Sequence, residues 1–162
     1  YNFIDILSHA KTDNVIVNQL IRDDKTFRSL TYNWFENSSL IKIIKTAAEN
    51  GFKLVITTDH GTVYVKKPSK VVGDRETSTN IRYKTGRSLT YENSDVWAIS
   101  NPEKLFLPKG NLSSKYIFAK NNIFLAYPKN YNHFVNYYKD TYQHGGISLE
   151  ECIMPISILE PK

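Results

Sequence analysis

The sequence predicts an α/β domain whose mixed or parallel sheet is covered by helices on both faces. Two observations carry this prediction. A segment with helical apolar spacing ends at Asn50-Gly51, and a strand-like run over residues 53–58 follows at once. That run stops at the polar turn Asp59-His60-Gly61. Helix, glycine, strand and turn in this order are typical of parallel sheets, whose ligands gather beyond the carboxyl ends of the strands.

The bulk composition is that of one globular domain. The chain has 162 residues, 41% of them hydrophobic and 23% charged. No apolar run approaches the roughly 20 residues of a membrane span, so membrane insertion is not expected. One cysteine excludes an internal disulfide and fits a cytoplasmic protein. The net charge of +5 favours anionic partners such as phosphoesters or nucleic acid, although a solvated lysine-rich surface explains it equally well.

The first half of the chain contains three further expected elements. Residues 2–7 are expected to form a short buried strand. Apolar residues with helical spacing predict a helix over residues 13–35. A second helix, over residues 40–48, can be capped by Ser38 or Ser39 and ends at Asn50-Gly51.

The second half begins with a polar, basic segment, residues 66–94, which is expected to be a mobile loop or a ribbon over the site. Strands are predicted over residues 95–100, 116–119, 122–126 and 153–159. Between the last two, Ser148 and Glu151 have the spacing of a capping box at the start of a short helix.

Three of the four histidines stand in patterns that suit a metal ion. Asp5 precedes His9 by four residues, Asp59 adjoins His60, and His144 is followed by two glycines. Together these residues offer carboxylate oxygens and imidazole nitrogens, which suit zinc. Each pattern alone is common in ordinary turns and caps, so their coincidence in one chain is what indicates a metal site.

Several stretches resemble the PglZ domains of the alkaline phosphatase superfamily: FIDILSHA, FRSLTYNWFENSSLIKII, VITTDHGTV, IRYKTGRSL and HGGISLEECIMPISIL. Within that family, the chain is most similar to the output domains of PorX-type response regulators linked to type IX secretion. The resemblance implies that residues 1–162 are the C-terminal part of one alkaline-phosphatase-like domain, without its N-terminal strands. It also implies a cytoplasmic regulator that can form a homodimer.

The resemblance assigns two zinc sites. Asp5, His9 and His144 would hold one ion, and Asp59 with His60 would hold the other. The superfamily completes the second site with another aspartate and a nucleophilic threonine or serine on earlier segments. Both are therefore expected upstream of this chain, which alone is predicted to be inactive.

The implied activity is zinc-dependent hydrolysis of phosphomonoesters or phosphodiesters, with a nucleotide or oligonucleotide as substrate. Arg82, Lys84 and Arg87 could bind the substrate phosphates, or could belong to a solvated loop. A different hypothesis is a non-catalytic output module in which the metal stabilises a partner-binding surface. Sulfatases and phosphonate hydrolases share the same metal ligands, so these activities stay open as well.

Overall fold

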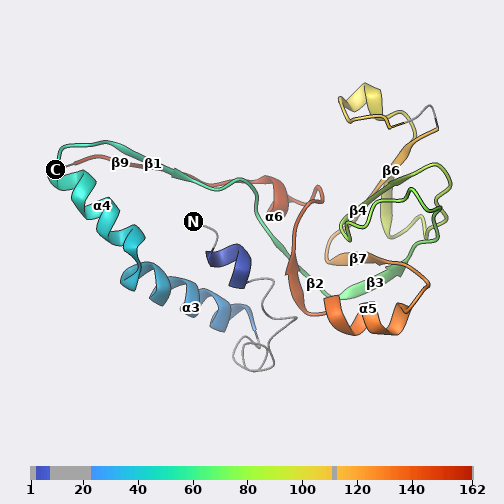
Figure 1. Ribbon diagram of the computed structural model, residues 1–162, viewed down its shortest axis with the longest axis horizontal. Coiled ribbons are helices and arrows are strands. Elements are labelled where there is room, and N and C mark those ends of the chain that lie inside the picture. Colours follow the sequence, from blue (N-terminus) through green and yellow to red (C-terminus); the bar gives the residue numbers. More distant parts are fainter. Residues whose placement is uncertain (1–2, 8–22, 111–112, 162) are drawn as a thin grey trace. The chain divides into compact units, whose positions relative to one another are not determined.

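The computed structural model describes residues 3–7, 23–110 and 113–161 (Figure 1). The chain divides into two compact units. The terminal unit consists of Tyr1–Asp59 and Met154–Lys162, and the central unit consists of His60–Ile153. The boundary therefore falls between Asp59 and His60, inside the predicted metal-binding turn.

Two helices of the terminal unit confirm the helical patterns of the sequence. Helix α3 spans Asp24–Asn37, and the side chain of Asp23 caps it by accepting the backbone N–H of Thr26 at 2.7 Å. Helix α4 spans Ser39–Glu49, and the Ser38 hydroxyl accepts the N–H of Leu40 at 3.2 Å. The part of the first expected helix that precedes residue 23 lies outside the described residues.

The expected strand over residues 2–7 is wrong, because residues 3–7 are helical. The aromatic ring of Phe3 stacks on Trp34 of α3, with 4.5 Å between ring centroids and 7° between ring planes. Such a contact with a neighbouring helix outweighs the preference of isolated isoleucines for extended backbone.

The expected strand after Gly51 is confirmed, but its partner is different. Strand β1, Leu54–Thr57, pairs antiparallel with β9, Ile156–Leu159, with Leu54 opposite Leu159. A sheet covered by helices on both faces would bury this strand, whereas 63% of Val55 is exposed. Helix–strand order predicts where a strand lies along the chain, but it does not specify the strand that pairs with it.

The central unit is built from short strands. Strand β2 (Val63–Val65) pairs antiparallel with β8 (Thr141–Gln143). Strand β3 (Lys67–Lys70) pairs parallel with β7 (Ile123–Ala126). A three-stranded antiparallel sheet has the order β4 (Tyr83–Gly86), β6 (Lys115–Ala119), β5 (Val96–Ile99). The remaining elements are η1 (Pro102–Leu105), α5 (Tyr131–Tyr138) and α6 (Leu149–Cys152).

The predicted α/β class is confirmed, but the extended parallel sheet is not. In the described residues the sheets have two or three strands and are mostly antiparallel. Parallel pairing of consecutive strands needs a long crossover connection. The links between β2 and β3 and between β6 and β7 are too short to hold a crossover helix.

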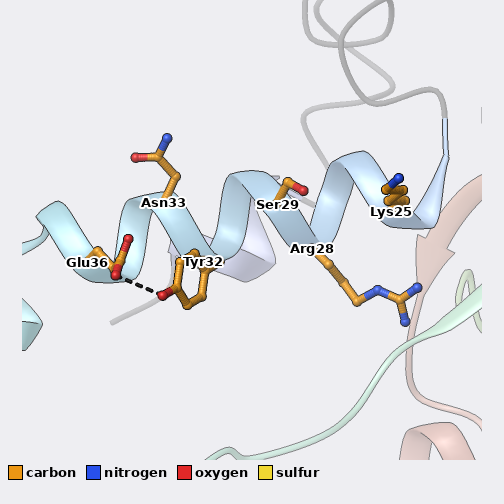
Figure 2. A pocket seen from close by; sticks show the side chains of 6 residues that line it. All are labelled: Lys25, Arg28, Ser29, Tyr32, Asn33 and Glu36. Carbon is orange, nitrogen blue, oxygen red and sulfur yellow. Dashed lines mark hydrogen bonds between the residues drawn. The ribbon is translucent and has the colours of Figure 1, made fainter.

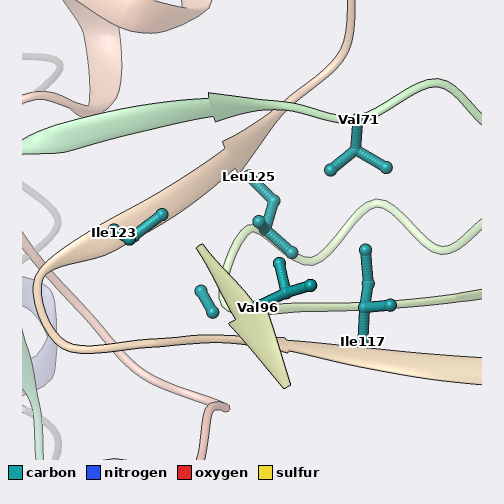
Figure 3. Close-up of a cluster of buried hydrophobic side chains, with 6 residues drawn as sticks. Val71, Val96, Ile117, Ile123 and Leu125 are labelled. Carbon is teal, nitrogen blue, oxygen red and sulfur yellow. The ribbon is translucent and has the colours of Figure 1, made fainter. Parts of the chain in front are cut away.

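Strand β7 lies between two hydrophobic clusters, and all four of its residues are buried. Ile123 and Leu125 belong to the first cluster, which Figure 3 shows together with Val71, Val96 and Ile117. The alternate residues of β7 point to the other side, where the second cluster consists of Val63, Val65, Ile81, Phe124 and Ala126. Burial on both faces explains why this strand is continuously apolar.

The basic segment over residues 66–94 contributes strands and buried residues to the central unit. It contains β3 and β4, and the side chains of Val71 and Ile81 are part of the two clusters. Lys67 also forms an ion pair with the buried Asp95, with 2.7 Å between Nζ and Oδ1. Among the described helices, none has the length and apolar character needed to cross a bilayer.

Candidate metal centre

The loops before β2 and after β8 place two histidines side by side. Val63 pairs with Gln143, so the start of β2 adjoins the end of β8. His60 lies shortly before β2, and His144 directly follows β8. Their imidazole rings stack, with 3.9 Å between ring centroids and 14° between ring planes. Two histidines that the resemblance assigns to different zinc sites therefore share one location in the central unit.

The geometry of this histidine pair suits a metal ion. Both side chains are partly buried, and one ring nitrogen of each lies within 4.8 Å of the other. The Nδ1 atom of His60 is 3.1 Å from the carbonyl oxygen of Gly61. Protonated Nδ1 would donate to that oxygen and leave Nε2 as the metal ligand, which is how backbone carbonyls commonly orient ligating histidines. The donor set therefore fits zinc, which accepts imidazole nitrogen readily.

The other predicted ligands belong to a different part of the chain. Asp5 is in the helical segment 3–7 of the terminal unit, and Asp59 is the last residue before the unit boundary. The exposed Asp59 accepts a 3.4 Å hydrogen bond from the Thr58 hydroxyl. His9 lies outside the described residues. The roles of these three residues as zinc ligands stay predictions.

Glu151 connects the loop of His144 to the interior of the central unit. It is the last member of the predicted capping box, which the structure confirms at the start of α6. Its carboxylate accepts the backbone N–H of Gly146 at 2.9 Å and that of Ser148 at 3.1 Å. Arg82 binds the same carboxylate through two nitrogens, Nε at 2.9 Å and Nη2 at 2.8 Å.

The contacts of Glu151 with Arg82 and two backbone N–H groups oppose the effect of burial on its pKa. Burial alone would raise the pKa of the Glu151 carboxyl group. The hydrogen bond and positive charge of Arg82, with the two backbone N–H donors, outweigh burial and lower that pKa below its ordinary value. Glu151 is therefore an ionised carboxylate, fully paired inside the protein.

Two glycines let these loops approach α6 closely. A Cβ atom on Gly61 would lie 2.0 Å from the carbonyl oxygen of Glu150. A Cβ atom on Gly146 would lie 2.5 Å from Oε2 of Glu151. A side chain at Gly61, next to His60, would collide with backbone, and one at Gly146, two residues after His144, would displace the Glu151 carboxylate.

The three residues predicted to bind substrate phosphate differ in exposure. Arg82 is buried in its pair with Glu151. Lys84 is buried as well, with Nζ donating to the Thr79 carbonyl at 3.1 Å and lying 4.2 Å from the centroid of the Tyr127 ring. Arg87 is half-exposed and pairs with Glu76 at 2.7 Å. Of the three, Arg87 alone offers a guanidinium group at the surface, and phosphate binding stays a prediction.

Sequence reasoning found Glu151 through its capping-box spacing but missed its partner Arg82. Nothing local to IRYKTGRSL distinguishes a buried arginine from an exposed one, because the partner is 69 residues away. The alternation Ile81, Tyr83, Thr85 favours the opposite arrangement, with Arg82 and Lys84 on the solvent face, whereas both are buried in the structure.

A shallow hollow lies along α3 in the terminal unit, where Figure 2 shows the six side chains that line it. The lining residues are Lys25, Arg28, Ser29, Tyr32, Asn33 and Glu36, and the Tyr32 hydroxyl donates to Glu36 at 2.8 Å. All six come from one face of one helix. Binding sites generally bring together groups from several elements, so this hollow is a solvent-facing helix side.

Comparison with known proteins identifies one family. A scan against models of protein families matches residues 1–158 to PglZ, described as the BREX system PglZ alkaline phosphatase-like domain. A search of curated proteins found no match. The family description names a BREX system, and the response-regulator context that the resemblance implies stays a prediction.

Proposed function

This chain belongs to the PglZ family of alkaline phosphatase-like domains, and we propose that it forms part of a zinc-dependent phosphoesterase. The stacked pair His60 and His144 is the observation that carries the proposal, because it offers two imidazole nitrogens at one place. An ordinary turn would not by itself bring histidines from two distant segments into a stacked contact.

The charge of the chain supports an anionic substrate. Residues 60–153 hold 13 lysines and arginines and eight aspartates and glutamates, which accounts for the whole net charge of +5. The histidine pair lies in this same unit. A positive field around a site raises the local concentration of phosphate-bearing molecules. We therefore propose a phosphoester of a nucleotide or oligonucleotide as the substrate.

Residues of the central unit would bind the metal and the substrate phosphate. His60 and His144 would bind the metal, with the Gly61 carbonyl orienting the His60 ring. Zinc, when bound, supplies a Lewis acid that activates a nucleophilic oxygen and stabilises charge on the phosphoryl group. The half-exposed Arg87 would bind a phosphate oxygen through its guanidinium group.

The proposal is tested by metal analysis and turnover in the full-length protein. We expect bound zinc and hydrolysis of an aryl phosphodiester or an aryl phosphomonoester, with both lost after chelation and restored by zinc. An aryl sulfate and an aryl phosphonate in parallel distinguish the related hydrolase classes. Zinc binding without turnover of any of these substrates would refute the enzyme and favour the metal-stabilised interaction module. Absence of bound zinc would refute both.

A further inference from the structure

Arg82 and Glu151 form an ion pair in the interior of the central unit. The two side chains are 0% and 1% exposed. Two nitrogens of Arg82 meet the two carboxylate oxygens of Glu151, and its Nη1 donates to the backbone carbonyl of Ile123. Burying two charges is costly, and a two-point contact fixes their mutual orientation. Such a pair is a rigid anchor for whatever else is bonded to it.

The first segment bonded to this anchor is the loop that carries His144. Oε1 of Glu151 accepts the N–H of Gly146, and Oε2 accepts the N–H of Ser148. Each carboxylate oxygen thus accepts one bond from Arg82 and one from the loop. The backbone of residues 146–148 is therefore held in one place relative to Arg82.

The second segment is the loop that carries His60. The backbone carbonyl of Glu151 accepts the N–H of Gly61 at 3.0 Å. Gly61 directly follows His60, and Gly146 lies two residues after His144. One residue, Glu151, is therefore bonded to the chain beside each of the two stacked histidines.

The segment that leads into Arg82 touches the His144 loop as well. The Asn80 side chain accepts the backbone N–H of Arg82 at 2.8 Å. Its Nδ2 atom lies 2.8 Å from the position of a Cβ atom on Gly145, whose φ of +95° also favours glycine. Gly145, the residue after His144, is thus packed against the segment that precedes β4 and contains Arg82.

We propose that the Arg82–Glu151 pair is a positioning element that holds His60 and His144 in their stacked, metal-binding arrangement. Because both side chains are buried, neither would contact the metal or the substrate, and Arg82 acts through Glu151. The inference rests on the proposed function for its purpose, but the positioning itself concerns the protein without metal. It also gives the buried Arg82 a role other than binding substrate phosphate.

Glu151→Gln in the full-length protein tests the proposal. The amide nitrogen of glutamine cannot accept a hydrogen bond, so two of the four bonds to the carboxylate are lost. We expect the zinc dissociation constant, measured by competition with a chromogenic chelator, to rise by about 10–100-fold, as for other groups that orient metal ligands. In metal-free protein with ¹³C-labelled histidine, the ring signals of His60 and His144 should shift. The exposed His133 on α5 serves as the internal control.

Glu76→Gln is the matched control. It makes the same chemical change in a glutamate that pairs with arginine, but Arg87 and Glu76 are 53% and 60% exposed. Zinc affinity and all histidine signals should stay unchanged in this variant.

Two results would overturn the positioning role. One is a folded Glu151→Gln protein with unchanged His60 and His144 signals or with zinc affinity within about twofold of the parent. The other is loss of folding in both Glu151→Gln and Arg82→Lys, which would assign the pair to general stability. If the parent protein binds no zinc, the proposed function fails, while the histidine signals of the metal-free protein still decide the positioning role.

Discussion

The imidazole rings of His60 and His144 lie face to face, 3.9 Å apart between ring centroids. One ring precedes the first strand of the central unit and the other follows its last strand, so the β2–β8 pairing creates the contact. The pair is thus a product of tertiary structure, and neither VITTDHGTV nor the HGG motif predicts it alone.

Replacing either stacked histidine should weaken zinc binding. His60→Ala and His144→Ala each remove one imidazole nitrogen from the proposed metal centre. We expect the zinc dissociation constant to rise by at least about 100-fold, the upper range for losing an orienting neighbour, because a ligand contributes more than its support. Hydrolysis of an aryl phosphodiester should be abolished at limiting zinc.

His133→Ala is the control for this prediction. His133 is exposed on α5, where its ring stacks on Tyr137 at 6.2 Å between ring centroids. Zinc affinity should be that of the parent protein. Unchanged metal content in His60→Ala would remove His60 from the metal centre.

Local signals in the sequence predicted the elements that depend on local chemistry. Ser38 caps α4 and Ser148 with Glu151 forms a capping box, because each cap involves residues only two or three positions apart. The apolar run before Asp59 forms β1 for the same kind of reason.

The features that the sequence did not predict depend on distant partners. The helical turn at residues 3–7 packs on Trp34 through Phe3. β1 pairs with β9 from the other end of the chain. Arg82 was read as a surface charge, whereas Glu151 neutralises it in the interior. A single sequence displays the charge of such a residue but not the group that pairs with it.

Gly61→Ala should distort the turn that carries His60. The added Cβ atom would lie 2.0 Å from the backbone carbonyl oxygen of Glu150, which cannot rotate away as a side chain could. We expect a loss of about 1–3 kcal/mol in the free energy of unfolding and weaker zinc binding. Urea titration and chelator competition measure the two effects.

Gly110→Ala provides the comparison. A Cβ atom there would lie 3.7 Å from the Ser114 hydroxyl, an ordinary contact distance. The variant should match the parent protein in both measurements. Equal behaviour of the two alanine variants would show that Gly61 and α6 are not closely packed.

Arg87→Gln should raise KM for a phosphodiester by several-fold without reducing stability. The ion pair between Arg87 and Glu76 is half-exposed, and such pairs contribute about 0–1 kcal/mol. A loss of affinity for substrate would therefore reflect phosphate binding and not unfolding. Arg75→Gln, at an exposed arginine of the same segment, should leave KM unchanged. Equal KM values for both variants would exclude Arg87 from the site.

The buried Lys84 should make stability depend on pH in the alkaline range. Burial lowers the pKa of Lys84 from 10.5 to about 8. Between these two values the unfolded chain keeps a proton that the folded protein has released, so stability rises as pH increases from about 8 to 10.5. Below pH 8 both states are charged, and burial of the ammonium group costs about 3 kcal/mol at 1.4 kcal/mol for each pKa unit.

Lys84→Met should therefore stabilise the protein at pH 7 and abolish this rise. The gain should be about 1–3 kcal/mol, because the variant also loses the hydrogen bond to Thr79 and the contact with the Tyr127 ring. Urea unfolding at pH 7, 8, 9 and 10 measures both effects. Lys70→Met, which changes an exposed lysine of β3, should leave the pH dependence of the parent intact. A Lys84→Met protein that is less stable at pH 7, or that keeps the alkaline rise, would show that Lys84 is not buried as a charged group.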